Sequence, residues 1–259
     1  MNRIDSVFEG DHSPLLNIYF TAGHPALEDT LAIAKSLDEA GADLIEIGLP
    51  FSDPIADGPT IQSSSHEALE NGMSIAKLLD QLKGLRPQVK APVLLMGYIN
   101  PVLQYGFEKF CAKCQEVGVD GLILPDLPMY EYEELYAETL EKYGLYNVFL
   151  ITPQTSVDRI RKIDQLSKGF IYMVSSASTT GAKSGISDQQ VAYFERIAAL
   201  NLKNRRLIGF GISDHESFTK ASKYADGAIV GSAFIKQLEK DKSPAAIAAF
   251  VSSIKSPKS

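Results

Sequence analysis

Short apolar runs and longer amphipathic stretches alternate along the whole chain. Eight apolar runs, which recur roughly every thirty residues, predict strands. They lie at 15–21, 42–48, 92–97, 121–124, 147–152, 170–175, 206–210 and 227–231. Between these runs, apolar positions at helical spacing predict helices over 27–40, 64–85, 107–117, 130–143, 157–166, 188–200, 215–222 and 244–254. Continuous apolar strands that alternate with helices are typical of a parallel sheet covered on both faces.

Eight strand–helix units predict an α/β fold, a (β/α)8 TIM barrel. A doubly wound open sheet is the alternative, but it usually has fewer strands and a glycine-rich first turn, which this chain lacks. Ile4, Val7 and Phe8 share one side of a short N-terminal stretch and predict an extra helix there. Because no linker or low-complexity segment divides the chain, we expect one barrel domain over residues 1–259.

Composition narrows the class of protein. The net charge of −7 does not provide the positive potential that attracts nucleic acid, so we expect no nucleic-acid partner. The apolar runs are too short to cross a bilayer and the N-terminus lacks a signal-peptide core, so we expect a cytoplasmic protein without a membrane partner. Cys111 and Cys114 lie on the apolar face of a predicted helix and are interpreted as core residues. The four histidines share no ligand spacing, so we infer no metal.

Two carboxylates stand out against the apolar pattern. Glu46 interrupts the second strand, and Asp57 follows it in a loop rich in glycine and proline. A carboxylate in an apolar strand costs several kcal/mol unless it is paired, solvated or neutral. A pairing of Glu46 with a lysine or arginine, and a plain Asp-Gly turn at Asp57, are the purely structural alternatives. In a barrel Glu46 lies at the carboxyl end of a strand and Asp57 on the loop that follows, where such folds place their sites, and this suggests acid–base chemistry.

The last two predicted strands end in glycine-containing turns, Gly-Phe-Gly at 209–211 and Gly-Ser-Ala at 231–233. The loops after these strands are the usual phosphate site of the fold, because exposed backbone N–H groups and a helix N-terminus bind anions without lysine or arginine. The sequence therefore predicts a small substrate that carries phosphate. The small, polar loop 175–185 suits a lid, and a slack surface loop is the alternative.

The stretch Pro-Phe-Ser-Asp-Pro-Ile-Ala-Asp-Gly-Pro-Thr-Ile-Gln at 50–62 closely resembles the signature of the tryptophan synthase alpha subunit family. The resemblance covers nearly the whole chain and includes the motifs at 21–25, 98–101, 125–128, 180–181, 209–213 and 231–233. It implies a carbon–carbon lyase that splits indole-3-glycerol phosphate into indole and glyceraldehyde 3-phosphate, with no cofactor in this chain. It also implies a beta subunit that holds pyridoxal phosphate and receives the indole, in a heterotetramer of two alpha and two beta subunits.

The resemblance assigns roles to particular residues. Glu46 matches the catalytic acid and base, and Asp57 matches the aspartate that accepts the indole N–H. The residues implied to bind substrate are Tyr19, Ile61, Met96, Tyr98, Tyr172, Thr180, Gly181, Phe210, Gly211, Gly231 and Ser232. The residues implied to face the beta subunit are Asp53, Pro54, Asn100 and Pro101.

The chain departs from the family pattern at four of the motif positions: His24 where aspartate is frequent, Tyr19 for phenylalanine, Met96 for leucine and Ser176 for an arginine seen in some members. Other phosphate-binding barrels, such as sugar-phosphate isomerases or indole-glycerol-phosphate synthase, would not be expected to share the signature. A stand-alone lyase that releases free indole stays open. A non-catalytic partner of a beta subunit is also considered, although the presence of both carboxylates argues against it.

Overall fold

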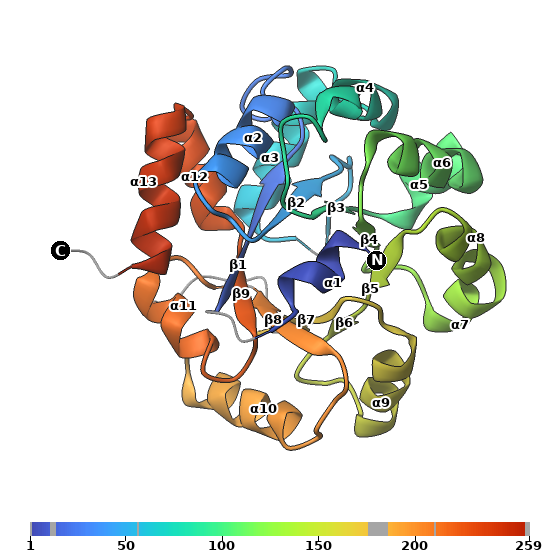
Figure 1. The fold of residues 1–259 in the computed structure, drawn as a ribbon, viewed down its shortest axis with the longest axis vertical. Helices are drawn as coiled ribbons and strands as arrows, with labels where there is room; N and C mark the ends of the chain where they lie inside the picture. The colour runs from blue at the N-terminus through green and yellow to red at the C-terminus, as the bar shows by residue number, and fades with distance from the viewer. Residues whose placement is uncertain (1, 11–13, 56, 176–185, 210, 257–259) are drawn as a thin grey trace.

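The structure, a computed structural model, describes residues 2–10, 14–55, 57–175, 186–209 and 211–256. Within these residues one parallel sheet runs in the order β5-β4-β3-β2-β1-β9-β8-β7-β6. Its strands are β1 (Leu15–Thr21), β2 (Leu44–Gly48), β3 (Val93–Met96), β4 (Gly121–Ile123), β5 (Tyr146–Val148), β6 (Leu150–Ile151), β7 (Phe170–Val174), β8 (Arg205–Gly209) and β9 (Gly227–Val230). The strands form a ring inside a ring of helices, which confirms the predicted barrel (Figure 1).

The two end strands of the sheet are consecutive in the chain. β5 pairs with β4 and β6 pairs with β7, so the pairing partner changes at Phe149. The predicted fifth strand, 147–152, is therefore divided in two. The Tyr172 amide donates to the Phe149 carbonyl at 2.9 Å, and the chain itself completes the ring at this residue.

Helices cover the outside of the sheet. The α-helices are α1 (Arg3–Val7), α2 (Thr30–Glu39), α3 (Pro59–Glu70), α4 (Ile75–Gln81), α5 (Ile99–Tyr105), α6 (Phe107–Val117), α7 (Met129–Glu131), α8 (Ala137–Lys142), α9 (Val157–Leu166), α10 (Asp188–Ala198), α11 (His215–Ala221), α12 (Ser232–Lys240) and α13 (Pro244–Lys255). A 3₁₀ turn, Leu82–Gly84, follows α4, and a π-helical stretch, Tyr132–Tyr136, joins α7 to α8.

The helices differ from the sequence prediction in two ways. The predicted helix 64–85 is interrupted at Gly72, whose φ of +86° does not suit a helix, and Ser74 then caps α4 through the amide of Lys77. In addition, α5 and α12 were not predicted. α12 begins directly after β9, because its first residue follows Gly231, the last residue of the predicted strand.

Apolar side chains fill two layers. Residues that face outward from the strands pack against the helices, and Cys111 and Cys114 belong to this layer, as predicted. Burial raises the pKa of the Cys111 thiol to about 12. A second cluster fills the inside of the barrel and includes Leu15, Leu44, Leu94 and Phe170.

The predicted N-terminal helix, α1, closes one end of the barrel. Ile4 is fully buried, and the ring of Phe8 lies 6.1 Å from that of Phe170, at the start of β7. Tyr146 donates to Asp5 at 2.6 Å, and Arg3 pairs with the buried Asp120 at 2.9 Å. Figure 1 shows α1 lying across this end of the ring. Because α1 covers the N-terminal ends of the strands, the opposite end is left for a site.

Candidate active site

The inward-facing side chains of three strands meet near the middle of the barrel. Tyr19 of β1 is the Cα partner of Glu46 of β2, and Tyr172 lies on β7. All three side chains are buried. The charges of Glu46 and Asp57 both help to raise the pKa of the Tyr172 hydroxyl, so the two carboxylates lie within electrostatic reach of the same tyrosine. The structure thus brings together the two carboxylates that the sequence singled out.

Glu46 is fully buried and is not part of an ion pair among the described residues. Its Oε1 accepts from the Asn17 side-chain amide at 2.5 Å, and its Oε2 has no hydrogen-bond partner in the described part of the chain. Burial raises the pKa of this carboxyl to about 8, against the smaller opposing effect of the Asn17 hydrogen bond. The carboxyl is therefore mostly protonated at neutral pH and ready to donate a proton.

Asp57 lies in the loop between β2 and α3. The Tyr98 hydroxyl donates to Oδ2 of Asp57 at 3.2 Å. The side-chain amide of Gln62, on α3, donates to the backbone carbonyl of Asp57 at 2.8 Å. Burial raises the pKa of Asp57 to about 6, although the bond from Tyr98 lowers it. Asp57 is therefore mostly ionised at neutral pH, so the two carboxylates differ in protonation state because they differ in burial.

Two glycines make room for the two inward tyrosines. A Cβ atom at Gly48 would overlap the Tyr19 hydroxyl, and a Cβ atom at Gly209 would overlap the Tyr172 hydroxyl. Each glycine lies at the carboxyl end of its strand, β2 or β8. This role of Gly48 could not be predicted from local sequence, because the signal lies in the register of neighbouring strands.

An aromatic pair lies beside Asp57. Tyr98, at the N-terminus of α5, packs on Phe51 with ring centroids 4.8 Å apart. Asp126 accepts from the Ile99 amide at 2.9 Å and fixes the first turn of α5, a contact that the sequence analysis missed. Met96 and Ile61 are partly buried. The ring of Tyr98, packed on Phe51, thus lies next to the Asp57 carboxylate.

The predicted phosphate residues lie at the ends of the last two barrel strands. Gly211, with a φ of +79°, is exposed after β8. Gly231 precedes α12, and its carbonyl accepts from the Phe234 and Ile235 amides, which begins the helix. Ser232 is the first residue of α12, where backbone N–H groups carry partial positive charge. Thr180, Gly181, Phe210 and Ser176 lie outside the described residues.

The four residues predicted to face a partner lie in two segments. Asp53 and Pro54 belong to the loop after β2, and Asn100 and Pro101 belong to α5. Next to these segments the side chains of Ile55 and Leu103 are 85% and 43% exposed. Both are large apolar side chains that contact solvent beside the predicted partner segments.

His24, one of the departures from the family pattern, lies in the loop after β1 and is fully buried. Its Nδ1 is 3.1 Å from the carboxylate of Glu67 on α3, and its Nε2 is 3.9 Å from that of Glu239 on α12. His24 therefore lies between α3, which follows the Asp57 loop, and α12, which follows Gly231.

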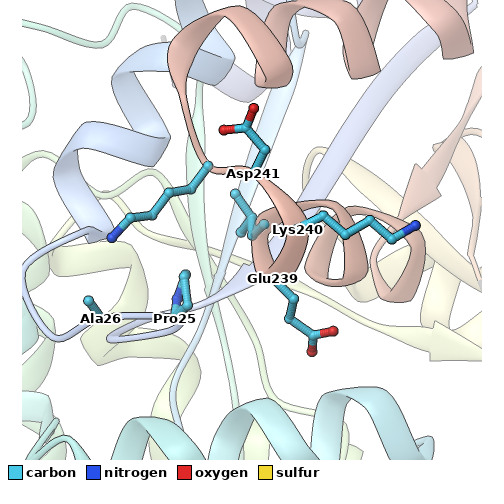
Figure 2. Close-up of a pocket in the computed structure, with 7 residues that line it drawn as sticks. Pro25, Ala26, Glu239, Lys240 and Asp241 are labelled. Carbon is cyan, nitrogen blue, oxygen red and sulfur yellow. The ribbon is translucent and has the colours of Figure 1, made fainter.

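A hollow of about 370 Å³ lies beside this histidine loop, between Pro25 and Ala26 on one side and the end of α12 on the other. Figure 2 shows Glu239 and Lys240 at the end of α12 and Asp241 just after it, with the Lys240 side chain pointing away from Pro25 and Ala26. Neither Glu46 nor Asp57 lines this hollow. Within the described ranges no group of three or more histidine, cysteine or acidic side chains could hold a metal ion, and no helix is long and apolar enough to cross a membrane.

Comparison with known proteins shows which family the chain matches. The family described as "Tryptophan synthase alpha chain" matches residues 10–255. The chain is 57% identical to the tryptophan synthase alpha chain of Christiangramia forsetii over 98% of this chain and 99% of that one. The chain belongs to the tryptophan synthase alpha chain family. This membership confirms the resemblance drawn from the sequence and supports a lyase role in tryptophan synthesis.

Further relatives agree with this family assignment. The tryptophan synthase alpha chain of Flavobacterium johnsoniae is 59% identical over 94% of this chain and 96% of that one. Among solved structures, the alpha chain of Legionella pneumophila matches with a TM-score of 0.88 and 36% identity, covering 98% of this chain and 96% of that one. A tryptophan synthase structure of M. tuberculosis in the aminoacrylate-bound form matches at 0.86 and 28%, covering 98% of each chain.

Proposed function

We propose that this chain cleaves indole-3-glycerol phosphate to indole and glyceraldehyde 3-phosphate without a cofactor of its own, and that it passes indole to a beta subunit. The observation that carries the proposal is a pair of carboxylates with separated pKa values, about 8 for Glu46, fully buried inside the barrel, and about 6 for Asp57, on the loop after β2. Such separation gives one group the role of acid and the other the role of an anion.

Glu46 is the proposed proton donor. Its protonated carboxyl delivers a proton to C3 of the indole ring, which makes that carbon the leaving carbon and places positive charge on the ring nitrogen. The carboxylate that forms then accepts the proton of the adjacent glycerol hydroxyl as the C–C bond breaks and the aldehyde forms. The two proton transfers balance, because Glu46 donates one proton and accepts one, and it therefore ends protonated as it began. Indole and glyceraldehyde 3-phosphate together contain the same atoms as the substrate.

Asp57 is proposed to accept the indole N–H and to stabilise the positive charge that grows on the ring nitrogen after C3 is protonated. Its ionised form at neutral pH suits this role, and the Tyr98 hydroxyl, at 3.2 Å, orients the carboxylate. Residues proposed to surround the indole ring are Tyr19, Ile61, Met96, Tyr98 and Tyr172.

The substrate phosphate is proposed to bind at the backbone amides of Gly211, Gly231 and Ser232. The partial positive charge at the N-terminus of α12 supports an anion there without a cationic side chain. For Thr180, Gly181 and Phe210 the contribution to substrate binding stays a prediction from the sequence.

A beta subunit is proposed to dock over Asp53, Pro54, Asn100 and Pro101, in an assembly of two alpha and two beta subunits. The exposed Ile55 beside this face supports the proposal, because burial of such a side chain would stabilise a complex. Pyridoxal phosphate is then expected in the beta subunit.

The test is an assay of indole release from indole-3-glycerol phosphate by the chain alone and with its cognate beta subunit. We expect release by the chain alone and a clear increase when the beta subunit is added. Equal release in both conditions would identify a stand-alone lyase. No release in either condition, combined with activation of the beta subunit, would identify a non-catalytic partner and refute the proposal.

A further inference from the structure

We propose that Asn17 is a positioning residue for Glu46: its side-chain amide holds Oε1, so that the proton which Glu46 transfers resides on Oε2. The inference deepens the proposed lyase function and rests on it. Neither the spacing of motifs nor the resemblance to the family pointed to this residue. The signal is a polar side chain in the middle of the apolar run 15–21.

The contact joins two neighbouring strands inside the barrel. Asn17 is fully buried on β1, where its Cα partners are Leu44 of β2 and Ile229 of β9. From this position its Nδ2 donates to Oε1 of Glu46, two residues further along β2. An amide buried among apolar residues costs free energy unless it makes such a bond. The position of Asn17 is therefore explained by its bond to Glu46.

The remaining polar atoms of Asn17 and Glu46 indicate which carboxyl oxygen of Glu46 carries the proton. In the described part of the chain, neither Oε2 of Glu46 nor Oδ1 of Asn17 has a hydrogen-bond partner. In a carboxylic acid the carbonyl oxygen is the better acceptor and the hydroxyl oxygen carries the proton. Because the Asn17 amide donates to Oε1, that oxygen takes the carbonyl role. The proton is thus left on Oε2, the oxygen that no described residue occupies.

The other titratable groups near Glu46 do not supply this donor. Tyr19 on β1 and Tyr172 on β7 both interact with the charge of Glu46, and Asp57 reaches the same tyrosines. The neighbouring strand β3 contributes Leu94 and Met96, which do not titrate. Among the described residues, the hydrogen bond from Asn17 is the interaction that lowers the pKa of Glu46 against the larger effect of burial. Asn17 therefore also keeps Glu46 able to ionise after it has given up its proton.

The experiment compares two variants of Asn17 with a matched control. Asn17→Leu keeps the number and branching of the side-chain heavy atoms but removes the amide, and Asn17→Asp keeps the shape but replaces the amide donor with a second carboxyl group, whose charge would also raise the pKa of Glu46. Asn147→Leu is the control, because Asn147 is a buried barrel asparagine whose Oδ1 also lacks a partner among the described residues. Its register partner Leu122 belongs to the outer layer, so it faces away from Glu46.

The pKa of Glu46 is read directly by carboxyl NMR on protein labelled with ¹³C at glutamate carboxyls, with the Glu46 signal assigned by its absence in Glu46→Gln. Loss of a hydrogen bond to a carboxylate should raise this pKa by about one unit or more. The same upward shift should move the alkaline limb of the pH profile of kcat/KM, and kcat at neutral pH should fall about tenfold. Asn147→Leu should change neither quantity.

An unchanged Glu46 pKa in a folded Asn17→Leu or Asn17→Asp protein would overturn the proposal. An equal shift of the Glu46 pKa in Asn147→Leu would also overturn it, because the shift would then follow from the loss of any buried amide and not from the contact with Asn17. Both outcomes are separable from failure of the proposed function. If the unmodified protein released no indole, the lyase proposal would fail, whereas the NMR titration would still report on the contact between Asn17 and Glu46.

Discussion

The buried carboxyl of Glu46 predicts a pH-dependent stability gain in Glu46→Gln. The pKa of this group rises from an ordinary 4.5 to about 8 on folding, so the native state binds the proton more tightly than the unfolded chain does. Below pH 4.5 both states are protonated and the carboxyl carries no penalty. As the pH rises from 4.5 to 8, the free energy of unfolding falls by about 1.36 kcal/mol per pH unit, because only the unfolded chain has released its proton.

The magnitude follows from these two pKa values. At pH 7 the native protein has lost about 3 kcal/mol, and above pH 8 the loss levels off at about 5 kcal/mol. Glutamine keeps the size of the side chain and does not titrate. The stability of Glu46→Gln relative to the unmodified protein should therefore rise across this window, while indole release falls about 10²–10⁴-fold or more.

The assay is equilibrium urea unfolding at pH values from 5 to 9, followed by circular dichroism because the chain contains no tryptophan. The exposed Glu9 provides a control variant, Glu9→Gln, which removes one carboxylate outside the barrel. A difference between Glu46→Gln and the unmodified protein that stays constant from pH 5 to pH 8 would refute the reasoning, because Glu46 would then titrate alike in both states. Near-normal turnover in Glu46→Gln would separately remove Glu46 from the mechanism.

Three further predictions address the rest of the site and the fold. Asp57→Asn should bind substrate with a similar Kd but lose about 10²–10⁴-fold in kcat, and a large rise in Kd with unchanged kcat would show that Asp57 only positions the substrate. A crystal soaked in phosphate or sulfate should show the anion at the backbone amides of Gly211 and Ser232, and an anion bound only elsewhere would contradict that placement. Asp120→Ala should destabilise the protein by about 3 kcal/mol, because the side chain is buried and accepts from Arg86 and from the Val93 amide. Its kcat in the folded state should stay unchanged, and urea unfolding checks the stability.

Most of the fold could be predicted from the sequence, because fully buried parallel strands leave a simple apolar signal. All seven residues of β1 are buried, and the predicted run has the same bounds as the strand. The division of the fifth run at Phe149 could not be predicted, because it depends on pairing with strands distant in the sequence. α12 was missed although Phe234, Ile235 and Leu238 give it an apolar face, because the glycine turn before it was interpreted only as a ligand site.

The site was predictable where a residue broke the local pattern. A charged Glu46 in an apolar strand is conspicuous, whereas the neutral Asn17 in the preceding strand breaks the pattern less and was missed. The raised pKa of Glu46 depends on complete burial, which only the closed barrel provides. The roles of Gly48 and Gly209 depend on which tyrosine lies beside each of them, and this follows from strand register rather than from sequence spacing.

The docking of α1 has a consequence for the order of events during synthesis. Its partners lie far along the chain: Ile4 approaches Gly121 and Gly169, and Phe8 packs against Phe170. A nascent chain that has not yet reached Phe170 exposes the apolar side of α1, because the surface that receives it is incomplete. α1 is too short to persist alone in water. The residues of α1 are synthesised before these partners and therefore reach their final place late, after β7 has emerged.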